Sequence, residues 1–132
     1  ITKANELTLN INGTPTSIEI DNQNKERKTN ISETYFWYKS NKIIQTTGGY
    51  QGQLLHGRYI ESYSNGQLKL KGFFRYGQQS GEWKYWDENG KLQRLENWKN
   101  NKLNGKVYYF KESGEVEVIK NFRKGILKTK TT

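Results

Sequence analysis

Hydrophobic, aromatic and glycine positions recur along this chain with a period of 24 residues. Self-similarity at a fixed period is typical of repeat architectures, in which each short unit packs against its neighbours. The period therefore predicts one repeated structural unit over most of the sequence. Four columns of residues keep it: Gly57, Gly81 and Gly105; Gly66, Gly90 and Gly114; Phe74, Trp98 and Phe122; and Leu68, Leu92 and Val116.

The repeated region is expected to span residues 31–128, with complete units at 57–80, 81–104 and 105–128. Residues 33–56 form a degenerate first unit, in which Glu33 and Lys42 occupy the two glycine positions. Residues 1–30 precede the repeats. They alternate in hydrophobicity around Asn12-Gly13, which predicts a strand pair, and then continue as a polar linker. Residues 129–132 are expected to form a tail.

Each unit is predicted to be a β-hairpin. Asn65-Gly66 and Asn89-Gly90 lie between aromatic and aliphatic segments, which favours a two-residue type I′ turn at each. Ser113-Gly114 is a weaker version of the same signal. Six glycines are accordingly predicted as structural turn residues: Gly57, Gly66, Gly81, Gly90, Gly105 and Gly114.

A two-residue turn fixes the register, so it predicts which side chains share a face of the sheet. With Tyr63 facing Leu68, one face carries Tyr59, Tyr63, Leu68 and Leu70. The equivalent positions in the next two units are Trp83, Tyr85 and Leu92, then Val107, Tyr109, Val116 and Val118. The opposite face carries Ile60, Trp86, Leu95, Tyr108, Phe110 and Ile119, mixed with Ser62, Lys69, Lys71, Lys84 and Gln93.

These features predict an all-β fold: an elongated, twisted antiparallel meander of 24-residue β-hairpin repeats, with an N-terminal strand pair. Successive hairpins are expected to lie side by side and to give about eight strands. The apolar side of the N-terminal pair is expected to cover the end or one face of the repeat sheet. Helices are disfavoured because two glycines per unit would each cost about 1 kcal/mol in a helix interior.

Composition agrees with a thin fold. Only 32% of the 132 residues are hydrophobic, yet 14% are aromatic, so rings are expected to supply most of the burial. The net charge of +9 is concentrated in residues 67–132, which hold 15 basic and 7 acidic side chains. Residues 119–130 contain no acid and form a predicted basic patch of Lys120, Arg123, Lys124, Lys128 and Lys130. Such a field favours acidic partners, and plain solubility is the alternative interpretation.

The unit at 81–105, GEWKYWDENGKLQRLENWKNNKLNG, resembles the MORN repeat, and more specifically its bacterial variant. The resemblance covers about residues 33–128, with 57–80 and 81–104 matching best. It implies hairpin units in an elongated sheet and a non-enzymatic role as a scaffold, a dimerisation module or a phospholipid-binding protein. It also implies an antitoxin or immunity role, since bacterial variants often carry that label. The degenerate unit and residues 1–30 depart from the family pattern.

No catalytic constellation is present in the sequence. The one histidine, His56, occupies a place filled by Ser80 and Asn104 in the next units, which favours an exposed loop residue. A paired-carboxylate hydrolase is the enzymatic alternative. The chain has no cysteine, and one histidine alone does not make a transition-metal site, so no metal or cofactor is predicted.

Three functions remain open. The first is a protein-binding module, such as an antitoxin or immunity partner or a scaffold in a bacterial envelope complex, that presents one sheet face to an acidic protein. Its predicted binding residues are Trp86, Phe110, Tyr108, Lys84, Lys71 and Lys69. The second is binding to anionic membrane through the basic C-terminal units. The third is single-stranded nucleic-acid binding, in which bases stack on exposed rings.

An exported location, in the periplasm or at the envelope, is expected because the sequence begins at Ile1 and contains no methionine, as after removal of a leader. A cytoplasmic location is the alternative.

Overall fold

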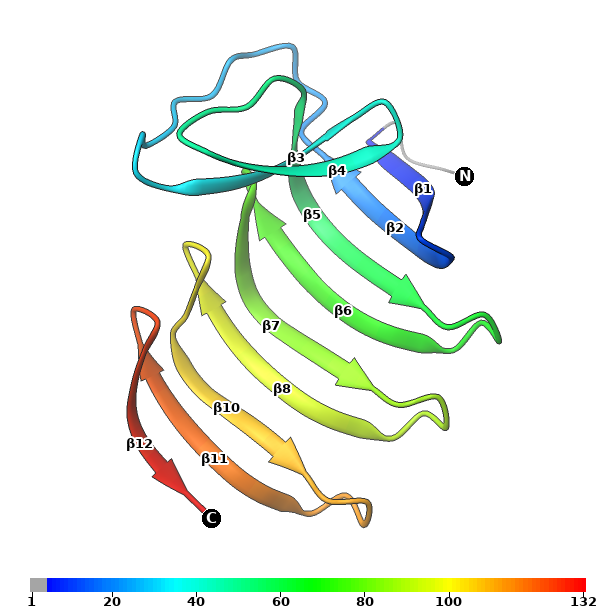
Figure 1. The fold of residues 1–132 in the computed structure, drawn as a ribbon, viewed down its shortest axis with the longest axis vertical. Coiled ribbons are helices and arrows are strands. Elements are labelled where there is room, and N and C mark those ends of the chain that lie inside the picture. The colour runs from blue at the N-terminus through cyan, green and yellow to red at the C-terminus, as the bar shows by residue number, and fades with distance from the viewer. Residues whose placement is uncertain (1–4) are drawn as a thin grey trace.

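The computed structural model describes residues 5–132, and these residues form an all-β fold without helices (Figure 1). The predicted fold class is confirmed. The strands are β1 (Glu6–Ile11), β2 (Thr14–Ile20), β3 (Thr34–Lys39), β4 (Lys42–Thr47), β5 (Gln53–Ser62), β6 (Leu68–Arg75), β7 (Gln78–Trp86), β8 (Leu92–Lys99), β9 (Lys102–Leu103), β10 (Gly105–Phe110), β11 (Val116–Arg123) and β12 (Ile126–Thr131).

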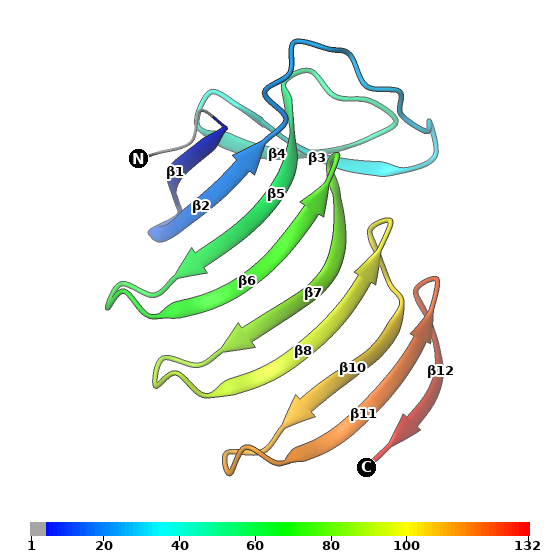
Figure 2. The ribbon, with the colours of Figure 1, turned by 180° about the vertical axis from the view of Figure 1, so that it is seen from behind.

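The main sheet has the strand order β1-β2-β5-β6-β7-β8-β10-β11-β12, and its neighbouring strands pair antiparallel. The hairpins β5–β6, β7–β8 and β10–β11 follow one another along the long axis of an open, twisted sheet (Figures 1 and 2). Each repeat therefore contacts only its neighbours, as the 24-residue period predicts.

The predicted two-residue turns are wrong at one end of the hairpins. The N–H of Gly66 donates to the carbonyl of Tyr63 at 2.9 Å, and the N–H of Tyr63 donates to the carbonyl of Gln67 at 2.8 Å. This pattern encloses three residues, a type I turn followed by a glycine with φ of 90°. Gly90 and Gly114 close equivalent loops in the next two hairpins. Glycine is needed there because the third loop residue adopts positive φ.

Two-residue turns with positive φ at both central residues occur instead at the opposite end of the sheet. They are Tyr76-Gly77, Asn100-Asn101 and Lys124-Gly125, again 24 residues apart. Each turn is tied to the neighbouring hairpin by one backbone hydrogen bond: Gly77 N–H to the Leu55 carbonyl, Asn101 N–H to that of Gln79, and Gly125 N–H to that of Leu103. The repeats are thus linked at this edge as well as through their strands.

A β-bulge beside each three-residue loop changes the predicted faces. Glu61 pairs with Leu70, but Ser62 pairs with Leu68, so Lys69 is an extra residue on β6. The pairs Trp86–Leu92 and Phe110–Val116 show the same shift. Directly paired residues share a face, so the extra residue moves three aliphatic side chains away from the face of Tyr59. The predicted placement was wrong for Leu68, Leu92 and Val116, which lie with Ser62, Trp86 and Phe110.

Three of the predicted turn glycines are not at turns. Gly57 and Gly81 lie inside β5 and β7, and Gly105 begins β10. Their φ values of 119°, 72° and 108° disfavour other residues and interrupt regular pairing, so these strands bend at the glycines. Each one lies opposite the aromatic column of the repeat, in the pairs Gly57–Phe74, Gly81–Trp98 and Gly105–Phe122.

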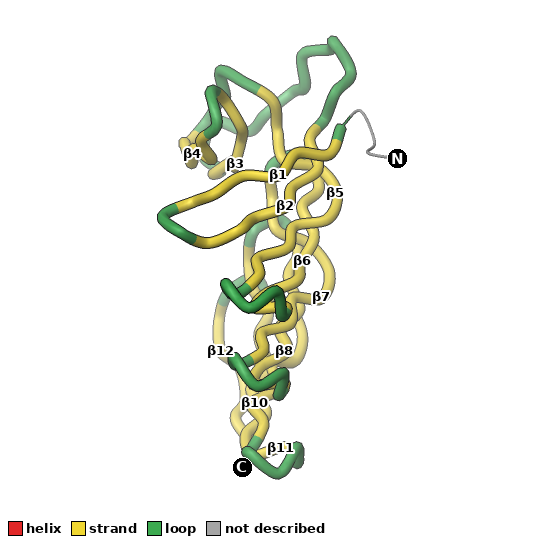
Figure 3. The backbone as a smooth tube through the Cα atoms, turned by 90° about the vertical axis from the view of Figure 1, so that its right-hand side faces the viewer, coloured by secondary structure: helices red, strands yellow, loops and turns green. Residues whose placement is uncertain are grey.

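The N-terminal hairpin β1–β2 extends the sheet, because β2 pairs with β5 through Ile18–Tyr59 and Ile20–Leu55. The degenerate unit was expected to continue the meander, and this was wrong. Its hairpin β3–β4 is paired with β5 only at Trp37–Leu54 and Tyr38–Gln53. It projects to one side of the sheet instead (Figure 3). Since β2 already occupies the edge of β5, β3–β4 has no position in the plane of the main sheet.

We call the side of the main sheet that faces β3–β4 the covered face, and the other side the open face. The core lies on the covered face, where Phe36, Tyr38 and Ile43 of the hairpin pack against a buried cluster of Leu9, Ile18, Ile20, Leu55, Phe74 and Trp83. The other side of β3–β4 carries Tyr35 and Trp37, which are buried with Leu54. Both sides of the hairpin are therefore packed.

Candidate binding surface

The open face carries pairs of apolar side chains beside the three-residue loops. Trp86 pairs with Leu92 and Phe110 with Val116, one repeat apart. The rings of Tyr108 and Phe110 stack, with centroids 6.4 Å apart. Val116 is 44% exposed and Leu92 is half-buried, so the protein itself covers neither of them fully. A repeated aromatic and aliphatic row on an uncovered sheet is suited to contact with another molecule.

Lysines lie next to this row on the same face. Lys71 and Lys84 are directly paired across β6 and β7, and Lys84 also pairs with Leu95, which pairs with Tyr108. Like charges directly opposite each other on a sheet are destabilising, so the fold gains nothing from this pair. Lys69 lies at the bulge, with its ammonium 5.8 Å from the centroid of the Tyr63 ring. The structure thus places five of the six predicted binding residues on one face, with Lys69 at its margin.

Three exposed apolar residues of the open face were absent from the predicted binding set. Leu68 is 41% exposed and pairs with Ser62, and Phe73 is 41% exposed and pairs with Arg58; Val116 is the third. Leu68 and Val116 were placed on the other face because a regular hairpin was assumed. Their spacing in the sequence does not indicate the bulge that moves these two side chains to the open face.

The predicted basic patch forms a separate surface at β11 and β12. Lys120 pairs with both Val107 and Lys130, which places it on the covered face, where its ammonium is 5.1 Å from the Tyr109 ring centroid. Arg123, Lys124 and Lys128 are exposed around the last turn. Next to them Ile126 and Leu127 are 60% and 47% exposed. The patch therefore does not merge with the row of Trp86 and Phe110.

A buried carboxylate organises the middle of the covered face. Glu96 is only 7% exposed, and it accepts hydrogen bonds from the Tyr85 hydroxyl and the Trp98 indole N–H, both at 2.8 Å. The guanidinium of Arg94 lies 3.1 Å from the same carboxylate and 4.0 Å from the Tyr85 ring centroid. Burial, and then the bond to Glu96, raises the pKa of Tyr85 to about 12. The carboxylate joins the other three side chains, two by hydrogen bonds and Arg94 by an ion pair in which its buried Nε makes no hydrogen bond, which indicates a structural network.

The predicted exposed position of His56 is wrong. His56 lies in β5 and stacks on Tyr76, with ring centroids 3.9 Å apart, and its Nδ1 accepts the backbone N–H of Tyr76 at 3.0 Å. Burial lowers the pKa of His56. Asn104, the repeat equivalent, accepts the N–H of Lys124 at 3.0 Å in the same way. The histidine therefore fastens a turn, and an asparagine does so two units later.

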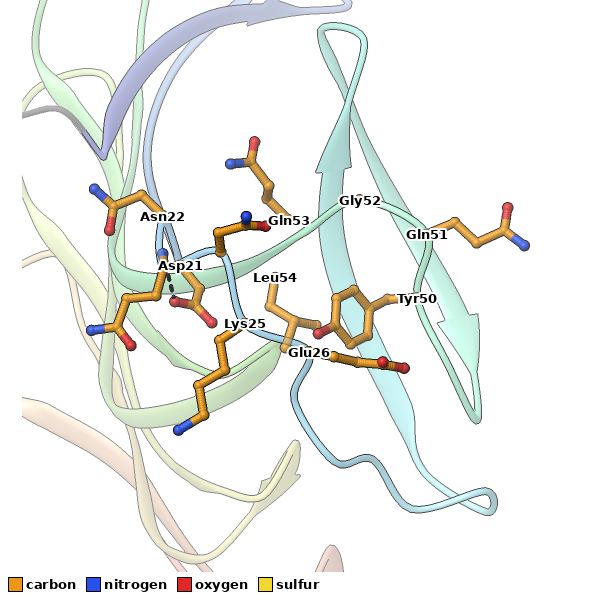
Figure 4. A pocket seen from close by; sticks show the side chains of 11 residues that line it. Asp21, Asn22, Lys25, Glu26, Tyr50, Gln51, Gly52, Gln53 and Leu54 are labelled. Carbon is orange, nitrogen blue, oxygen red and sulfur yellow. Dashed lines mark hydrogen bonds between the residues drawn. The ribbon is translucent and has the colours of Figure 1, made fainter.

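The polar linker borders a pocket of about 420 Å³ (Figure 4). Arg27 holds the linker in place by a 2.8 Å ion pair with Asp21, and its guanidinium lies 4.7 Å from the Tyr76 ring centroid. The hydrogen bonds from Arg27 lower the pKa of Asp21. The Tyr50 hydroxyl accepts the backbone N–H of Arg27 at 2.8 Å. The remaining lining is mostly amide side chains that lie in the solvent, and the two ordered polar groups, Asp21 and Tyr50, are already bonded to Arg27.

Residues 5–132 contain no cluster of three or more histidine, cysteine or carboxylate side chains that could hold a metal ion. The same span has no helix of the length and hydrophobicity that a membrane crossing requires.

The family model for the MORN repeat variant matches residues 55–76 and 79–100. The two matched segments together cover one third of the chain. They run from β5 to the first two-residue turn and from β7 to the second, so the resemblance predicted from the sequence is confirmed for both. No curated protein matches the chain. MORN repeats are commonly protein- or membrane-binding modules and are generally not enzymes.

Proposed function

We propose that this MORN-type sheet is a protein-binding module, and that its open face takes an acidic protein partner. The observation that carries the proposal is the repeated apolar row, Trp86–Leu92 and Phe110–Val116, beside the facing pair Lys71 and Lys84. Aromatic residues flanked by cations are frequent anchors at protein interfaces. An acidic partner would also relieve the repulsion between the two lysines.

The proposal extends to two kinds of partner: a toxin neutralised by this protein as an antitoxin or immunity factor, or a component of an envelope complex in which it acts as a scaffold. Both are consistent with an exported location. Both need a rigid surface, which the meander supplies because β5, β6, β7, β8, β10 and β11 are each paired on both sides. A rigid interface loses little conformational entropy on binding.

The test is co-purification from the organism that encodes the chain, with three versions of the protein as bait. The wild type is compared with the double variant Trp86→Ser, Phe110→Ser and with Ile31→Ser, a control that alters an 85% exposed aliphatic residue in the turn before β3. An anchor residue contributes about 2 kcal/mol or more, so the double variant is expected to bind at least about 100-fold more weakly. Ile31→Ser is expected to bind as wild type. Equal recovery of the partner by the double variant, or no stoichiometric partner at all, contradicts the proposal.

A second candidate function is attachment to anionic membrane through β11 and β12. The exposed pair Ile126 and Leu127 lies among Arg123, Lys124 and Lys128, and this combination of aliphatic and basic side chains suits a lipid surface. Each basic residue near such a surface contributes about 1 kcal/mol. Co-sedimentation with vesicles that contain anionic lipid is expected to exceed that with neutral vesicles, and equal recovery in both excludes this function.

A further inference from the structure

A groove of about 210 Å³ lies where the β3–β4 hairpin meets the covered face. It spans the first and second MORN units, on the opposite side of the sheet from the proposed protein-binding surface. Nothing in the proposed function uses it. Its lining consists of five aromatic rings, the Glu61 carboxylate, the Gln79 amide and two aliphatic side chains. The rings are those of Phe36, Tyr59, Phe74, Trp83 and Tyr85, and the aliphatic residues are Ile43 and Leu70.

The rings meet at steep angles and form a corner. The ring of Phe74 is nearly perpendicular to those of Tyr59 and Trp83, at 78° and 86°, with centroids 5.5 and 5.3 Å apart. Phe74 and Trp83 are 4% and 3% exposed and form the floor. Tyr59, Tyr85 and Phe36 are half-buried at the rim. Aromatic rings that border one small volume are typical of sites that bind an organic cation.

The carboxylate in this aromatic corner is unusual for an apolar groove. Within residues 5–132, the one hydrogen bond that the Glu61 carboxylate accepts is from the Tyr59 hydroxyl, at 2.7 Å to Oε2. Burial, and then this bond, raises the pKa of Tyr59, so its hydroxyl keeps its proton and remains a donor. Glu61 has no basic partner in this part of the chain. A carboxylate at the mouth of an aromatic groove is therefore left with an unbalanced negative charge.

In the later repeats, the residue equivalent to Glu61 lies next to a cation. One unit later, the residue equivalent to Glu61 is Tyr85, and the guanidinium of Arg94 lies 4.0 Å from its ring centroid. Two units later it is Tyr109, with the ammonium of Lys120 at 5.1 Å. In both later units the chain supplies its own cation to the covered face.

The first unit differs from the later ones in two ways. Leu70 stands where the second unit has Arg94, and a carboxylate stands where the later units have tyrosine. The internal cation is lost and a negative charge is gained at the same place. Arg94 does not counter this charge, because it is paired with Glu96 at 3.1 Å.

We propose that this groove binds a small organic cation of the alkylammonium class. The aromatic rings contact the alkyl groups of the cation, and Glu61 balances its charge. A ligand with a compact, weakly hydrated head group fits best, because the floor made by Phe74 and Trp83 offers no hydrogen-bond acceptor to a strongly hydrated ion. The site is independent of the protein-binding surface on the open face.

The test uses choline as the probe and its uncharged carbon isostere, 3,3-dimethylbutan-1-ol, as the matched control ligand. Binding to the full chain is followed by the indole N–H signal of Trp83 in ¹H–¹⁵N spectra, at constant ionic strength set with sodium chloride. Choline is expected to shift this signal in a saturable way and to bind about tenfold or more tightly than the isostere. Equal affinity of the two ligands, or no saturable shift with choline, overturns the proposal.

Two variants of equal charge change separate the site from the net charge of the protein. Glu61→Gln keeps the shape of the side chain and an acceptor for the Tyr59 hydroxyl, and it is expected to weaken choline binding about tenfold. Glu82→Gln removes a carboxylate from the exposed side of β7, where Glu82 pairs with Asn97, and is expected to bind as wild type. Unchanged binding by a folded Glu61→Gln, or equal weakening by both variants, contradicts the assignment. The comparison of choline with its isostere on the wild type stands even if a variant fails to fold.

Discussion

Gly72 provides the most stringent test of the packing on the covered face. It lies in β6, opposite Tyr59, and the Trp83 ring lies directly on its backbone. A Cβ added at Gly72 would lie 2.1–2.4 Å from three atoms of that ring. Ordinary carbon contacts are about 3.5–4.0 Å, so Gly72→Ala forces the indole away by more than about 1 Å.

The structure sets the size of the effect. Pushing the indole within the core creates overpacking, which costs about 1–3 kcal/mol and occasionally more. Expelling it removes a 3% exposed tryptophan from the core, at about 3–5 kcal/mol. The protein adopts the less costly response, so Gly72→Ala is expected to lower the free energy of unfolding by about 1–3 kcal/mol.

The assay is urea unfolding followed by tryptophan fluorescence, with Gly49→Ala as the matched control. Gly49 has no heavy atom within 4 Å of an added Cβ and has an ordinary φ, so its substitution is expected to change the free energy of unfolding by less than about 0.5 kcal/mol. At about 4 °C of Tm per kcal/mol, Gly72→Ala should melt roughly 4–12 °C below the wild type. A difference of less than about 0.5 kcal/mol between the two variants would refute the contact between β6 and the indole.

Two further predictions concern buried polar groups. Burial lowers the folded-state pKa of His56 below its ordinary 6.5, so its contribution to the free energy of unfolding is fully present above pH 6.5 and is lost as pH falls through the folded-state pKa. His56→Asn keeps an acceptor for the Tyr76 N–H, so between pH 7.5 and 5.5 it should lose less free energy of unfolding in urea than the wild type loses. An equal loss in both proteins would contradict the role of the ring. Glu96→Ala leaves Tyr85 and Trp98 without their acceptor and is expected to lower the free energy of unfolding in urea by about 3 kcal/mol. Glu96→Gln should recover part of this loss because the amide oxygen can still accept a hydrogen bond. A loss below about 1 kcal/mol for Glu96→Ala would exclude the network.

The sequence was sufficient to predict the repeat, its hairpins and the antiparallel meander, because the 24-residue period repeats the same glycine and aromatic positions. It was not sufficient for the loops. Asn65-Gly66 is compatible with both a two-residue turn and a three-residue loop, and only the hydrogen bond from Gly66 to Tyr63 distinguishes them. The hydrophobic pattern of the sequence does not indicate the bulge at Lys69 either, and this bulge places Leu68 on the other face of the sheet.

The position of β3–β4 could not be predicted for a different reason. The degenerate unit keeps the hairpin pattern, and nothing local in it excludes a place in the sheet. The position of β3–β4 depends on which strand pairs along the edge of β5, and β2 occupies that edge through pairs such as Ile18–Tyr59. Long-range competition of this kind is not encoded in the periodicity of either segment. The aromatic groove follows from it, because the groove exists only where β3–β4 crosses the covered face.

For the predicted binding residues, too, the sequence was sufficient for some positions and not for others. Alternation along β7 was enough to place Lys84 and Trp86 on the less apolar face. It could not show that Lys120 would lie on the opposite side, since the predicted patch was defined by charge along the sequence and not by register.

The account depends on a sheet with one covered and one open face, and hydroxyl-radical footprinting of the tryptophans tests this most directly. Trp83 and Trp86 are three residues apart on β7 but lie on opposite faces, and Trp83 is 3% exposed. Oxidation measured by mass spectrometry is expected to be fast at Trp86 and slow at Trp83 and at Trp37, which is 6% exposed. Oxidation of Trp83 at the rate of Trp86, in a protein that remains folded, would contradict the covered face and everything inferred from it.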